Sequence, residues 1–368
     1  MSIKFLLIIH KLSYGGAEKN MAFLANNLLI AGHDVNLITY ENDQIMQKVL
    51  FGIHHFKIHH VISSAYGIRR LLQISSMRKA IKTIKPDIII SFLTYPNMIS
   101  IIASLGLQIP VIISERGDPY STKGWFYSFK DLIYRLADGY VFQSEEAMKF
   151  YNSKIQNKAT VIPNPVTIKI LTRDVKTPRD NIIVNVARLE LKQKRQDLLI
   201  KAFSMIASKY PTTKLIMFGD GEDEQTINKI ILQYRLENQV ILAGVSMNIF
   251  ESIKNARLFV LSSDYEGIPN ALIEALSFGL PCISTDYSPG GAKNLINNNK
   301  NGILVKIDSA EELSAAMEYI LCNPMIAECM GQNALKIIDN LDPEIIMEKW
   351  QEYINFIIQK NPKTVTKC

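Results

Sequence analysis

Short apolar runs alternate with amphipathic stretches along the first half of the chain. Residues 4–10 form the first apolar run, and residues 17–31 place apolar side chains at helical spacing. Gly32 stops that helix before a second apolar run begins at residue 35. Three further apolar runs cover residues 87–93, 110–114 and 139–144. Apolar strands separated by helices are typical of a parallel sheet that is buried on both faces.

The second half repeats this pattern after a break. Strand-like runs return at residues 181–188, 214–219, 239–244 and 256–263. Between the halves, at about residues 163–180, prolines and polar residues interrupt the pattern. We therefore predict an α/β protein with two doubly wound parallel sheets, in domains 1–167 and 168–345. A ligand is expected in the cleft between two such domains.

A long helical pattern runs from Pro343 to Lys360 near the end of the chain. We predict that residues 346–368 form a C-terminal helix and tail that can cross back to the first domain.

Residues 88–114 are the one stretch that resembles a membrane span. They include 27 residues without a charged side chain, whereas a spanning helix needs roughly 20. Pro96 and Pro110 divide the stretch into a strand, a helix and a second strand of a buried sheet.

The N-terminus has no cleavage site of a signal peptide, and the four cysteines form no CxxC pair. We therefore expect a cytoplasmic protein with reduced thiols.

Composition agrees with a folded protein, and the charge is unevenly distributed. Hydrophobic residues are 48% and charged residues 21% of the 368, which excludes a disordered or fibrous chain. Residues 1–167 contain 18 basic and 11 acidic residues, whereas residues 168–368 contain 23 and 24. Eight basic and no acidic residues lie between Asp43 and Asp87. We expect an anionic partner at that surface, but no nucleic acid, because no nucleic-acid-binding module is present.

Two sites after predicted strands could bind phosphate groups. Gly15 and Gly16 follow the first strand and open a helix, whose amino end favours anions. A tight turn that needs glycine is the alternative explanation. Arg188 ends a strand of the second half, and Lys194 follows six residues later. Two cations at the carboxyl edge of a parallel sheet would suit a diphosphate, although solvated surface cations are the more common case.

Residues 262–281 contain the most specific pattern in the chain. Glu266 lies in a Gly/Pro-containing loop directly after a predicted strand. Glu274 is eight positions later. We predict that it lies two turns into a helix that begins near Asn270. In this arrangement both carboxylates can face the same ligand.

These two glutamates, in the sequence EGIPNALIEAL, resemble the paired-glutamate signature of the retaining glycosyltransferases of family 4. The resemblance covers nearly the whole chain, through GGAE, GHDV, KPDIIIS, IPNPV, VARL with Lys194, FGDGED and GILV. It implies a GT-B fold, in which two Rossmann-like domains face an interdomain cleft. The first domain would then bind the acceptor and the second the nucleotide sugar.

The resemblance also implies a role for each motif. Gly15 and Gly16 would face the reacting sugar and the β-phosphate, and Arg188 and Lys194 would stabilise the departing diphosphate. Glu266 would bind sugar hydroxyls. The remaining donor contacts would be Glu274 on the ribose, the stretches around Gly219 and Gly244 at the base, and the 286–291 loop with Gly290 at the phosphates. No metal and no other cofactor would be required.

One loop departs from the family pattern. Many relatives have a histidine after the strand that corresponds to residues 110–114, where this chain reads SERGDPY. Some relatives that act on lipid-linked saccharides have SER here as well. We therefore predict that Arg116 contributes to the sugar or acceptor site. The alternative is that Glu115, Arg116 and Asp118 only cap a helix and form salt bridges.

The histidine-rich segment at residues 54–60 does not predict a metal site. His55 and His59 share one face of a predicted strand with Lys57 between them, and no carboxylate or cysteine completes a ligand set. His54 and His60 are the other histidines of this segment. His10, which follows the first strand, is a candidate site residue.

Two amphipathic segments predict the acceptor side. Apolar residues recur at steps of three or four from Ile68 to Ile84 with basic residues between them, and residues 123–136 add Trp and Tyr. We expect the half from Met77 on to pack on the sheet, and the rest to bind the anionic inner leaflet of a membrane. The resemblance then implies a UDP-sugar donor and a polyprenyl-diphosphate-linked saccharide acceptor, as in bacterial O-antigen, capsule or other surface polysaccharide biosynthesis. For the two segments, ordinary solvated helices remain open as an alternative. For the function, the alternatives are a sugar-nucleotide epimerase of the same fold and a non-catalytic sugar-nucleotide-binding protein.

Overall fold

The computed structural model describes residues 2–13, 15–40, 47–58, 66–121, 124–166, 178–246 and 248–361. The chain divides into two compact units. The first unit is Met1–Pro165 together with Pro343–Cys368, and the second is Val166–Asp342.

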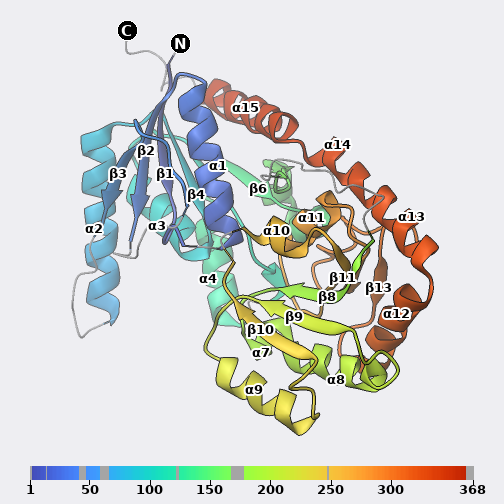
Figure 1. Ribbon diagram of the computed structural model, residues 1–368. Coiled ribbons are helices and arrows are strands. Elements are labelled where there is room, and N and C mark those ends of the chain that lie inside the picture. The colour runs from blue at the N-terminus through green and yellow to red at the C-terminus, as the bar shows by residue number, and fades with distance from the viewer. Residues whose placement is uncertain are drawn as a thin grey trace. The chain divides into compact units, whose positions relative to one another are not determined.

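The first unit contains a seven-stranded parallel sheet in the order β3-β2-β1-β4-β5-β6-β7 (Figure 1). The strands are β1 (Lys4–Ile8), β2 (Asp34–Thr39), β3 (His54–Lys57), β4 (Ile88–Phe92), β5 (Val111–Ser114), β6 (Gly139–Phe142) and β7 (Ala159–Val161). The strand order changes direction between β1 and β4. At such a switch point, the loops that follow the strands diverge and leave space for a ligand.

Helices cover both faces of this sheet. They are α1 (Gly16–Ile30), α2 (Tyr66–Ile84), α3 (Thr94–Ser104), α4 (Trp125–Tyr134), α5 (Glu145–Lys149) and α6 (Ser153–Gln156), with a 3-10 turn at Pro119–Ser121. Leu6 and Ile8 of β1 share a buried cluster with Met77 and Ile81 of α2. The predicted packing of the second half of the 68–84 segment on the sheet is therefore confirmed.

The uncharged stretch at residues 88–114 folds as β4, α3 and β5, as its prolines predicted. Within the described parts of the chain, no helix combines the length and apolar character that crossing a bilayer requires. The stretch is apolar because β4 and β5 are buried inside the sheet.

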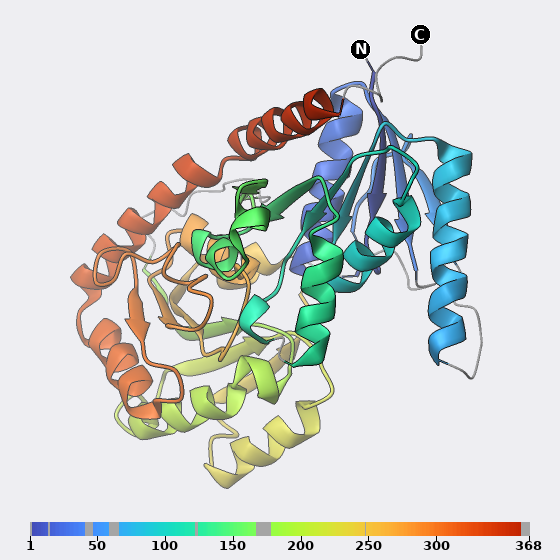
Figure 2. The ribbon, with the colours of Figure 1, turned by 180° about the vertical axis from the view of Figure 1, so that it is seen from behind.

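Helix α15 (Pro343–Lys360) has the predicted bounds and belongs to the first unit. The Trp350 ring stacks on Phe92 at the end of β4, with the ring centroids 5.9 Å apart. The Tyr353 hydroxyl accepts a hydrogen bond of 2.7 Å from the backbone N–H of Tyr140 in β6. In both ribbon views α15 lies beside α1 (Figures 1 and 2).

The second unit contains a six-stranded parallel sheet in the order β10-β9-β8-β11-β12-β13. The strands are β8 (Asp180–Val186), β9 (Lys214–Phe218), β10 (Val240–Gly244), β11 (Ala256–Leu261), β12 (Cys282–Thr285) and β13 (Ile303–Val305). The alternation of strand and helix predicted from the sequence is confirmed in both units.

The helices of the second unit are α7 (Leu191–Lys194), α8 (Gln196–Ala207), α9 (Glu224–Gln233), α10 (Ile249–Ile253), α11 (Asn270–Ser277), α12 (Ala310–Cys322), α13 (Pro324–Ala334) and α14 (Ile338–Leu341), with a 3-10 turn at Leu335–Ile337. Phe203 of α8 and Met317 of α12 are fully buried in one cluster with Val260 of β11. Cys282, Cys322 and Cys329 are free thiols.

Candidate active site

The carboxyl edge of the second sheet brings two distant segments together. Strands β8 and β11 are parallel neighbours, so the segments that follow them leave the sheet side by side. The segment after β8 carries Arg188 and Lys194, and the loop after β11 carries Glu266. Three of the predicted site residues therefore lie on adjacent segments of one unit.

Lys194 and Glu266 form an ion pair. Their side chains are only 14% and 10% exposed, so water screens the pair weakly. The Ser263 hydroxyl donates to Oε1 of Glu266 at 2.8 Å, and Nε2 of Gln193 donates to Oε2 at 3.3 Å. The Glu266 carboxylate is thus held in one orientation by three donors.

Hydrogen bonds to backbone carbonyls join the two segments. The N–H of Asp264 donates to the carbonyl of Gln193 at 2.9 Å, and the Ser262 hydroxyl donates to the carbonyl of Lys194 at 2.8 Å. Nε2 of Gln193 also donates to the carbonyl of Tyr265 at 3.0 Å. These bonds determine how far the ammonium of Lys194 lies from the loop that carries Glu266.

Arg195, which follows Lys194, has a left-handed backbone with φ +50°. Its guanidinium contacts three aspartates. Nη1 lies 3.1 and 2.9 Å from the two carboxylate oxygens of Asp264, Nη2 lies 2.8 Å from Asp308, and Nε lies 3.2 Å from Asp197. Burial alone would lower the pKa of Arg195, but the hydrogen bonds to these carboxylates raise it above its ordinary value.

Arg188 is an accessible cation at this edge. Its side chain is 65% exposed, and Nη2 lies 3.2 Å from a carboxylate oxygen of Glu190. Nε2 of Gln196 donates to the Arg188 carbonyl at 2.8 Å, so the backbone is fixed while the side chain remains in water. An exposed pair of this kind contributes little to stability, and the guanidinium can exchange Glu190 for an anionic ligand.

The glycine-containing loop after β9 packs directly on the segment after β8. A Cβ on Gly219 would collide with the carbonyl oxygen of Ala187, and its φ of +134° disfavours any other residue. The N–H of Gly219 donates to the carbonyl of Gly244, at the end of β10, at 2.8 Å. Gly219 and Gly244 therefore lie at the same edge of the sheet as Arg188.

Glu274 and the 286–291 loop are the other predicted donor-site segments of the second unit. Glu274 is the fifth residue of α11, just over one turn from its start and not the two turns that we expected. A Cβ on Gly291 would collide with the carbonyl of Gly267, which places the 286–291 loop against the Glu266 loop. Gly290 of this loop has φ +81°.

In the first unit, Gly15 is the N-cap of α1, and Gly16 is the first helical residue. The carboxylate of Glu18, in the first turn, lies against Gly15. It also accepts a hydrogen bond of 3.3 Å from Ser13. An acidic side chain at this position already complements the positive amino end of the helix. Tyr14, between these residues, lies outside the described residues.

Glu115 belongs to a buried polar network. Its carboxylate accepts hydrogen bonds from Tyr134 at 2.9 Å and Thr94 at 3.0 Å, and it lies 3.7 Å from the ammonium of Lys130. Burial, followed by the charge of Glu115, raises the pKa values of Tyr134 and Tyr151 well above 10. These contacts fit the alternative in which the loop forms structural salt bridges.

Arg116 is buried at the end of β5. Nη1 donates to Oδ1 of Asn164 at 2.8 Å, and the guanidinium lies over the Phe92 ring, 4.1 Å from its centroid. Burial lowers the pKa of Arg116 to about 9, which leaves the side chain charged at neutral pH. The contribution of Arg116 to the sugar or acceptor site stays a prediction.

The histidines and the cavity of the first sheet lie apart from these residues. Within the described ranges, no group of three or more His, Cys, Asp or Glu side chains is placed to hold a metal ion, and Nε2 of His55 contacts the Thr39 hydroxyl at 2.9 Å. His59 and His60 lie outside the described residues. A cavity of about 410 Å³ lies at the opposite end of the first sheet. Its lining includes Val111, the first residue of β5, and Asp138, which directly precedes β6.

Two family models match the chain on either side of the predicted seam. The model described as Glycosyltransferase Family 4 matches residues 14–169, and the model described as Glycosyl transferases group 1 matches residues 169–337. The chain thus contains both domains of a GT-B glycosyltransferase and fits family 4.

Several known proteins resemble this glycosyltransferase along most of their length. An enzyme from Campylobacter jejuni named GalNAc-alpha-(1->4)-GalNAc-alpha-(1->3)-diNAcBac-PP-undecaprenol alpha-1,4-N-acetyl-D-galactosaminyltransferase is 28% identical, over 96% of this chain and 98% of the enzyme. A second C. jejuni enzyme, an N-acetylgalactosamine-N,N'-diacetylbacillosaminyl-diphospho-undecaprenol 4-alpha-N-acetylgalactosaminyltransferase, is 25% identical over 86% of this chain and 90% of the enzyme.

The fold of the glycosyltransferase is that of solved GT-B structures. HepE from Anabaena, crystallised in complex with UDP and glucose, matches with a TM-score of 0.81 at 16% identity. The match covers 96% of this chain and 99% of HepE. The predicted fold of two Rossmann-like parallel-sheet domains is thereby confirmed.

Sequence analysis missed several residues that organise the site of the glycosyltransferase. Gln193, Arg195, Ser263 and Asp264 all contact or flank the Lys194–Glu266 pair. The cross-segment partners of Gln193, Arg195 and Asp264 are about 70 positions away in the chain, so no local spacing reveals them. Ser263 lies three residues from its partner Glu266. The only local signal was their position in the same two motifs, next to Lys194 and Glu266.

Proposed function

We propose that this chain is a retaining, metal-independent glycosyltransferase. It moves a hexose or N-acetylhexosamine from a UDP-sugar to a saccharide on a polyprenyl diphosphate, in the assembly of a bacterial surface polysaccharide or glycan. The observation that carries the proposal is the shielded Lys194–Glu266 pair at the carboxyl edge of the second sheet. The C. jejuni relatives, whose names specify diphosphoundecaprenol-linked acceptors, and HepE with its bound UDP support the substrate classes.

Departure of UDP is the step that the second unit would assist. When the bond between the anomeric carbon and the diphosphate breaks, negative charge grows on the leaving oxygen. Arg188 and Lys194 are two cations on one short segment after β8, and preorganised cations lower the barrier where charge develops. In this proposal they carry out the neutralisation that a divalent metal performs in other transferases.

The remaining side chains of the second unit would orient the donor. Glu266 accepts hydrogen bonds from sugar hydroxyls, and Glu274 accepts them from the ribose. Residues around Gly219 and Gly244 border the base. Backbone N–H groups of the 286–291 loop, which includes Gly290, donate to the phosphates. Pro289 has no N–H, and those of Asp286 and Gly290 already donate to the carbonyls of Val305 and Tyr287, so the other amides of the loop take this role.

Retention follows from attack on the face from which UDP leaves. The acceptor hydroxyl forms the new bond to the anomeric carbon as the bond to the phosphate oxygen breaks. The proton of that hydroxyl passes to the departing phosphate oxygen, so the products are a glycosylated acceptor and UDP. This step requires no protein base, in agreement with a Glu266 carboxylate that is already paired with Lys194.

The first unit would bind the acceptor at the membrane surface. Helix α4 buries Lys130, Ile133 and Tyr134 and exposes an apolar stripe on its other side. The stripe consists of Trp125, Phe126, Phe129 and Leu132 and continues to Leu136, just beyond the helix. Trp125 is 80% exposed. An apolar stripe with an interfacial tryptophan, in the half of the chain that carries the basic surplus, suits the anionic inner leaflet.

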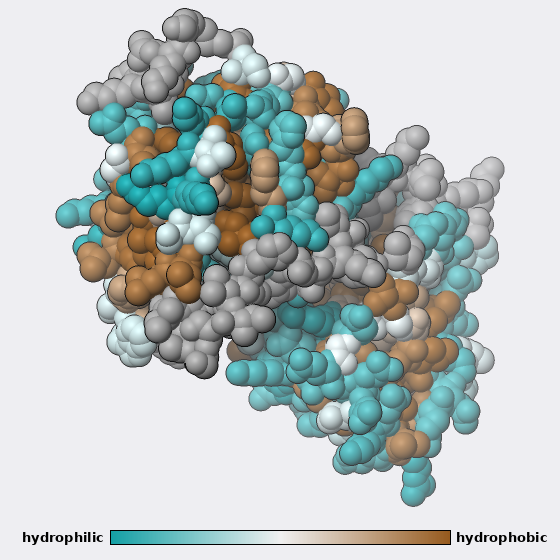
Figure 3. Space-filling view, turned by 90° about the vertical axis from the view of Figure 1, so that its left-hand side faces the viewer, coloured by the Kyte–Doolittle hydropathy of each residue, from teal (hydrophilic) through white to brown (hydrophobic). Residues whose placement is uncertain are grey.

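The surface on the side of α2 also carries apolar side chains. Leu71 is 68% exposed there, whereas Met77 and Ile81 are buried. Figure 3 views the molecule from this side and shows apolar patches among polar side chains. Contacts of α3 with both α2 and α4 place the three helices in one layer. We therefore include Leu71 and Leu72 of α2 in the proposed membrane-facing surface, while the protein remains peripheral.

A panel of radiolabelled UDP-sugars, incubated with the full chain and a lipid extract that contains polyprenyl-diphosphate-linked saccharides, tests the transferase proposal. We expect label in the lipid fraction with one of the sugars, in the presence of a chelator, and an α-linkage in the product of an α-linked donor. Epimerised donor without labelled lipid would show an epimerase. Binding without turnover would show a non-catalytic protein.

Flotation with vesicles of phosphatidylglycerol tests the membrane-facing surface. We expect the wild-type chain to float at low salt and the Leu132→Ser variant to float less, because Leu132 is 62% exposed within the stripe. Leu232→Ser is the matched control, since Leu232 is 57% exposed on α9 of the second unit. Equal flotation of both variants, or no flotation of the wild type, would contradict this surface.

A further inference from the structure

Arg195 occupies an unfavourable backbone conformation without being a glycine. It separates α7 from α8 with φ +50°, a region in which a side chain crowds the backbone. Asp308, which follows β13, is also left-handed with φ +56°. Nη2 of Arg195 lies 2.8 Å from Oδ1 of Asp308, so an ion pair joins two strained turns. Strain of this kind persists where the surrounding contacts require it.

The contacts of Arg195 extend to the loop that carries Glu266. Its Nη1 reaches both oxygens of Asp264, two residues before Glu266, while its own backbone directly continues from Lys194. One side chain thus connects the segment after β8, the loop after β11 and the turn after β13. The Arg195 side chain is 20% exposed and Asp264 is 30% exposed, so the pair is partly shielded from water.

We infer that Arg195 is a positioning residue for sugar transfer, which holds Lys194 and Glu266 at the separation that the reaction needs. The inference rests on the proposed function of that pair. Arg195 also neutralises the carboxylate of Asp264, two residues before Glu266. A guanidinium suits this role because its planar donors can contact several carboxylates at once, which a lysine ammonium does less well.

Replacement of Arg195 by glycine tests this inference without adding backbone strain. Glycine adopts φ +50° readily, so the Arg195→Gly variant should fold while losing all three aspartate contacts. We expect kcat to fall about 100-fold, since small displacements of reacting groups have effects of that size, while the Kd for UDP changes less than about threefold. The Arg195→Lys variant should recover part of kcat.

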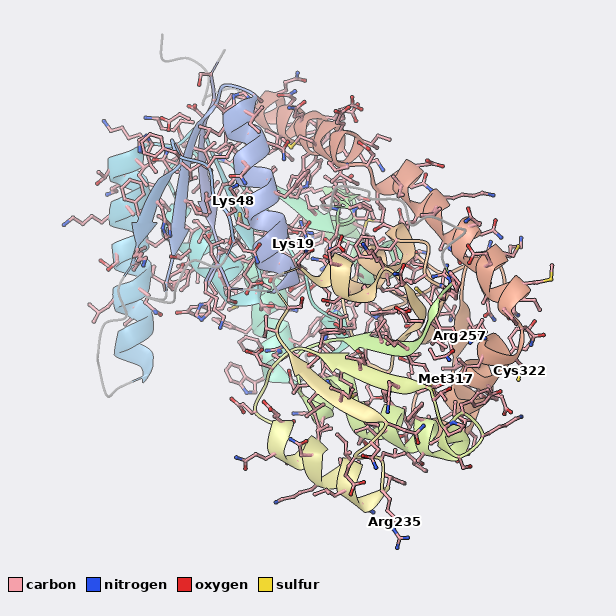
Figure 4. All side chains as sticks on the ribbon, in the orientation of Figure 1. Lys19, Lys48, Arg235, Arg257, Met317 and Cys322 are labelled. Carbon is pink, nitrogen blue, oxygen red and sulfur yellow. The ribbon has the colours of Figure 1, made fainter. Side chains whose placement is uncertain are left out.

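Arg235 supplies the matched control. It is also a left-handed arginine, with φ +55°, and it is exposed beyond the end of α9. Figure 4 shows its side chain projecting away from the second unit, and no ion pair of Arg235 occurs among the residues that the structure describes. The Arg235→Gly variant should keep kcat within about twofold of the wild type.

Two results would overturn the positioning role. One is an Arg195→Gly variant with kcat within about twofold of the wild type. The other is a loss of kcat that Arg195→Lys does not recover, together with a weaker affinity for UDP and a lower melting temperature. That combination indicates a purely structural residue. Glu266→Gln, measured in parallel, separates this inference from the proposed function. If Glu266→Gln is inactive and Arg195→Gly is active, only the positioning role is wrong, whereas full activity of both rejects the proposed function.

Discussion

The two carboxylate oxygens of Glu266 have different partners. Oε1 contacts both Lys194 and the Ser263 hydroxyl, whereas Oε2 has a single 3.3 Å hydrogen bond from Gln193. Oε2 is therefore the oxygen with spare capacity to accept a hydrogen bond from a sugar hydroxyl. In this account Oε1 orients the carboxylate and Oε2 contacts the donor sugar.

The Glu266→Gln variant tests this assignment. Glutamine has the same size but lacks the charge that pairs with Lys194, so we expect kcat to fall about 100-fold with the UDP affinity nearly unchanged. Steady-state kinetics and a UDP titration measure the two effects. Glu237→Gln, at an exposed position of the same unit, is the control. Wild-type turnover by Glu266→Gln would remove Glu266 from the proposed site.

A second residue-scale prediction concerns the buried pair of Glu115 and Lys130. Their side chains are 6% and 1% exposed. Lys130→Met leaves the Glu115 carboxylate without its buried cation, which should lower the free energy of unfolding by about 3–5 kcal/mol. Urea unfolding measures the loss. Adding Glu115→Gln to Lys130→Met should restore part of it, and a double variant less stable than Lys130→Met would contradict the pairing.

Residue-scale prediction from sequence succeeded where a residue follows a strand directly. Arg188 and Glu266 are recognisable because each comes within five residues of the end of an apolar strand, where parallel sheets place ligands. Lys130 was not recognisable in this way. It occupies the inward side of α4, and only the fold shows that Glu115 lies opposite it.

At the scale of elements, α15 is attached to the first sheet through Tyr353. Its hydroxyl accepts from the N–H of Tyr140 in β6 and donates to the carbonyl of Lys158, just before β7. A Cβ on Gly139 would lie 2.7 Å from this hydroxyl, so a larger residue there would displace the Tyr353 side chain. One side chain thus connects the helix to two neighbouring strands.

The Tyr353→Phe variant removes only this hydroxyl. It leaves a buried N–H and a carbonyl without their partner, and we expect the free energy of unfolding to fall by about 1–3 kcal/mol. Thermal or urea unfolding checks the value. Tyr319→Phe on α12 is the control, because Tyr319 is 43% exposed. Equal stability of Tyr353→Phe and the wild type would show that α15 does not depend on this contact.

Elements with a clear period were predictable from the sequence, and their outward faces were not. The apolar runs of β4 and β5 and the amphipathic pattern of α15 gave the right element types. In α4, however, apolar residues occur on both sides of the helix, so the period alone does not identify the exposed stripe. Short helices such as α7 were missed because one turn is too short to show a period.

At the scale of the whole molecule, buried tyrosines make the folded state less stable at high pH. Burial raises the pKa values of Tyr134 and Tyr151 in the first unit and of Tyr287 in the second unit well above 10. In the unfolded chain these phenols ionise near pH 10. The folded state therefore binds more protons than the unfolded state above that pH, and stability falls as pH rises further.

We expect the melting temperature to change little between pH 7 and about 9 on account of these groups, and to fall steeply above about pH 10. Absorbance of tyrosinate, recorded during the same titration, should rise together with unfolding. Ionisation of all fifteen tyrosines near pH 10 in a chain that stays folded would contradict the burial of these three.

The rate of sugar transfer in buffer freed of divalent cations, at saturating UDP-sugar, tests the central claim most directly. The claim is that Lys194 and Arg188, and not a metal ion, neutralise the departing diphosphate. We predict that an excess of chelator leaves the wild-type rate unchanged and that Lys194→Met lowers it by on the order of 10²–10³ in the same buffer. A wild-type rate that disappears with chelator and returns with added metal, or a Lys194→Met rate equal to that of the wild type, would contradict the account.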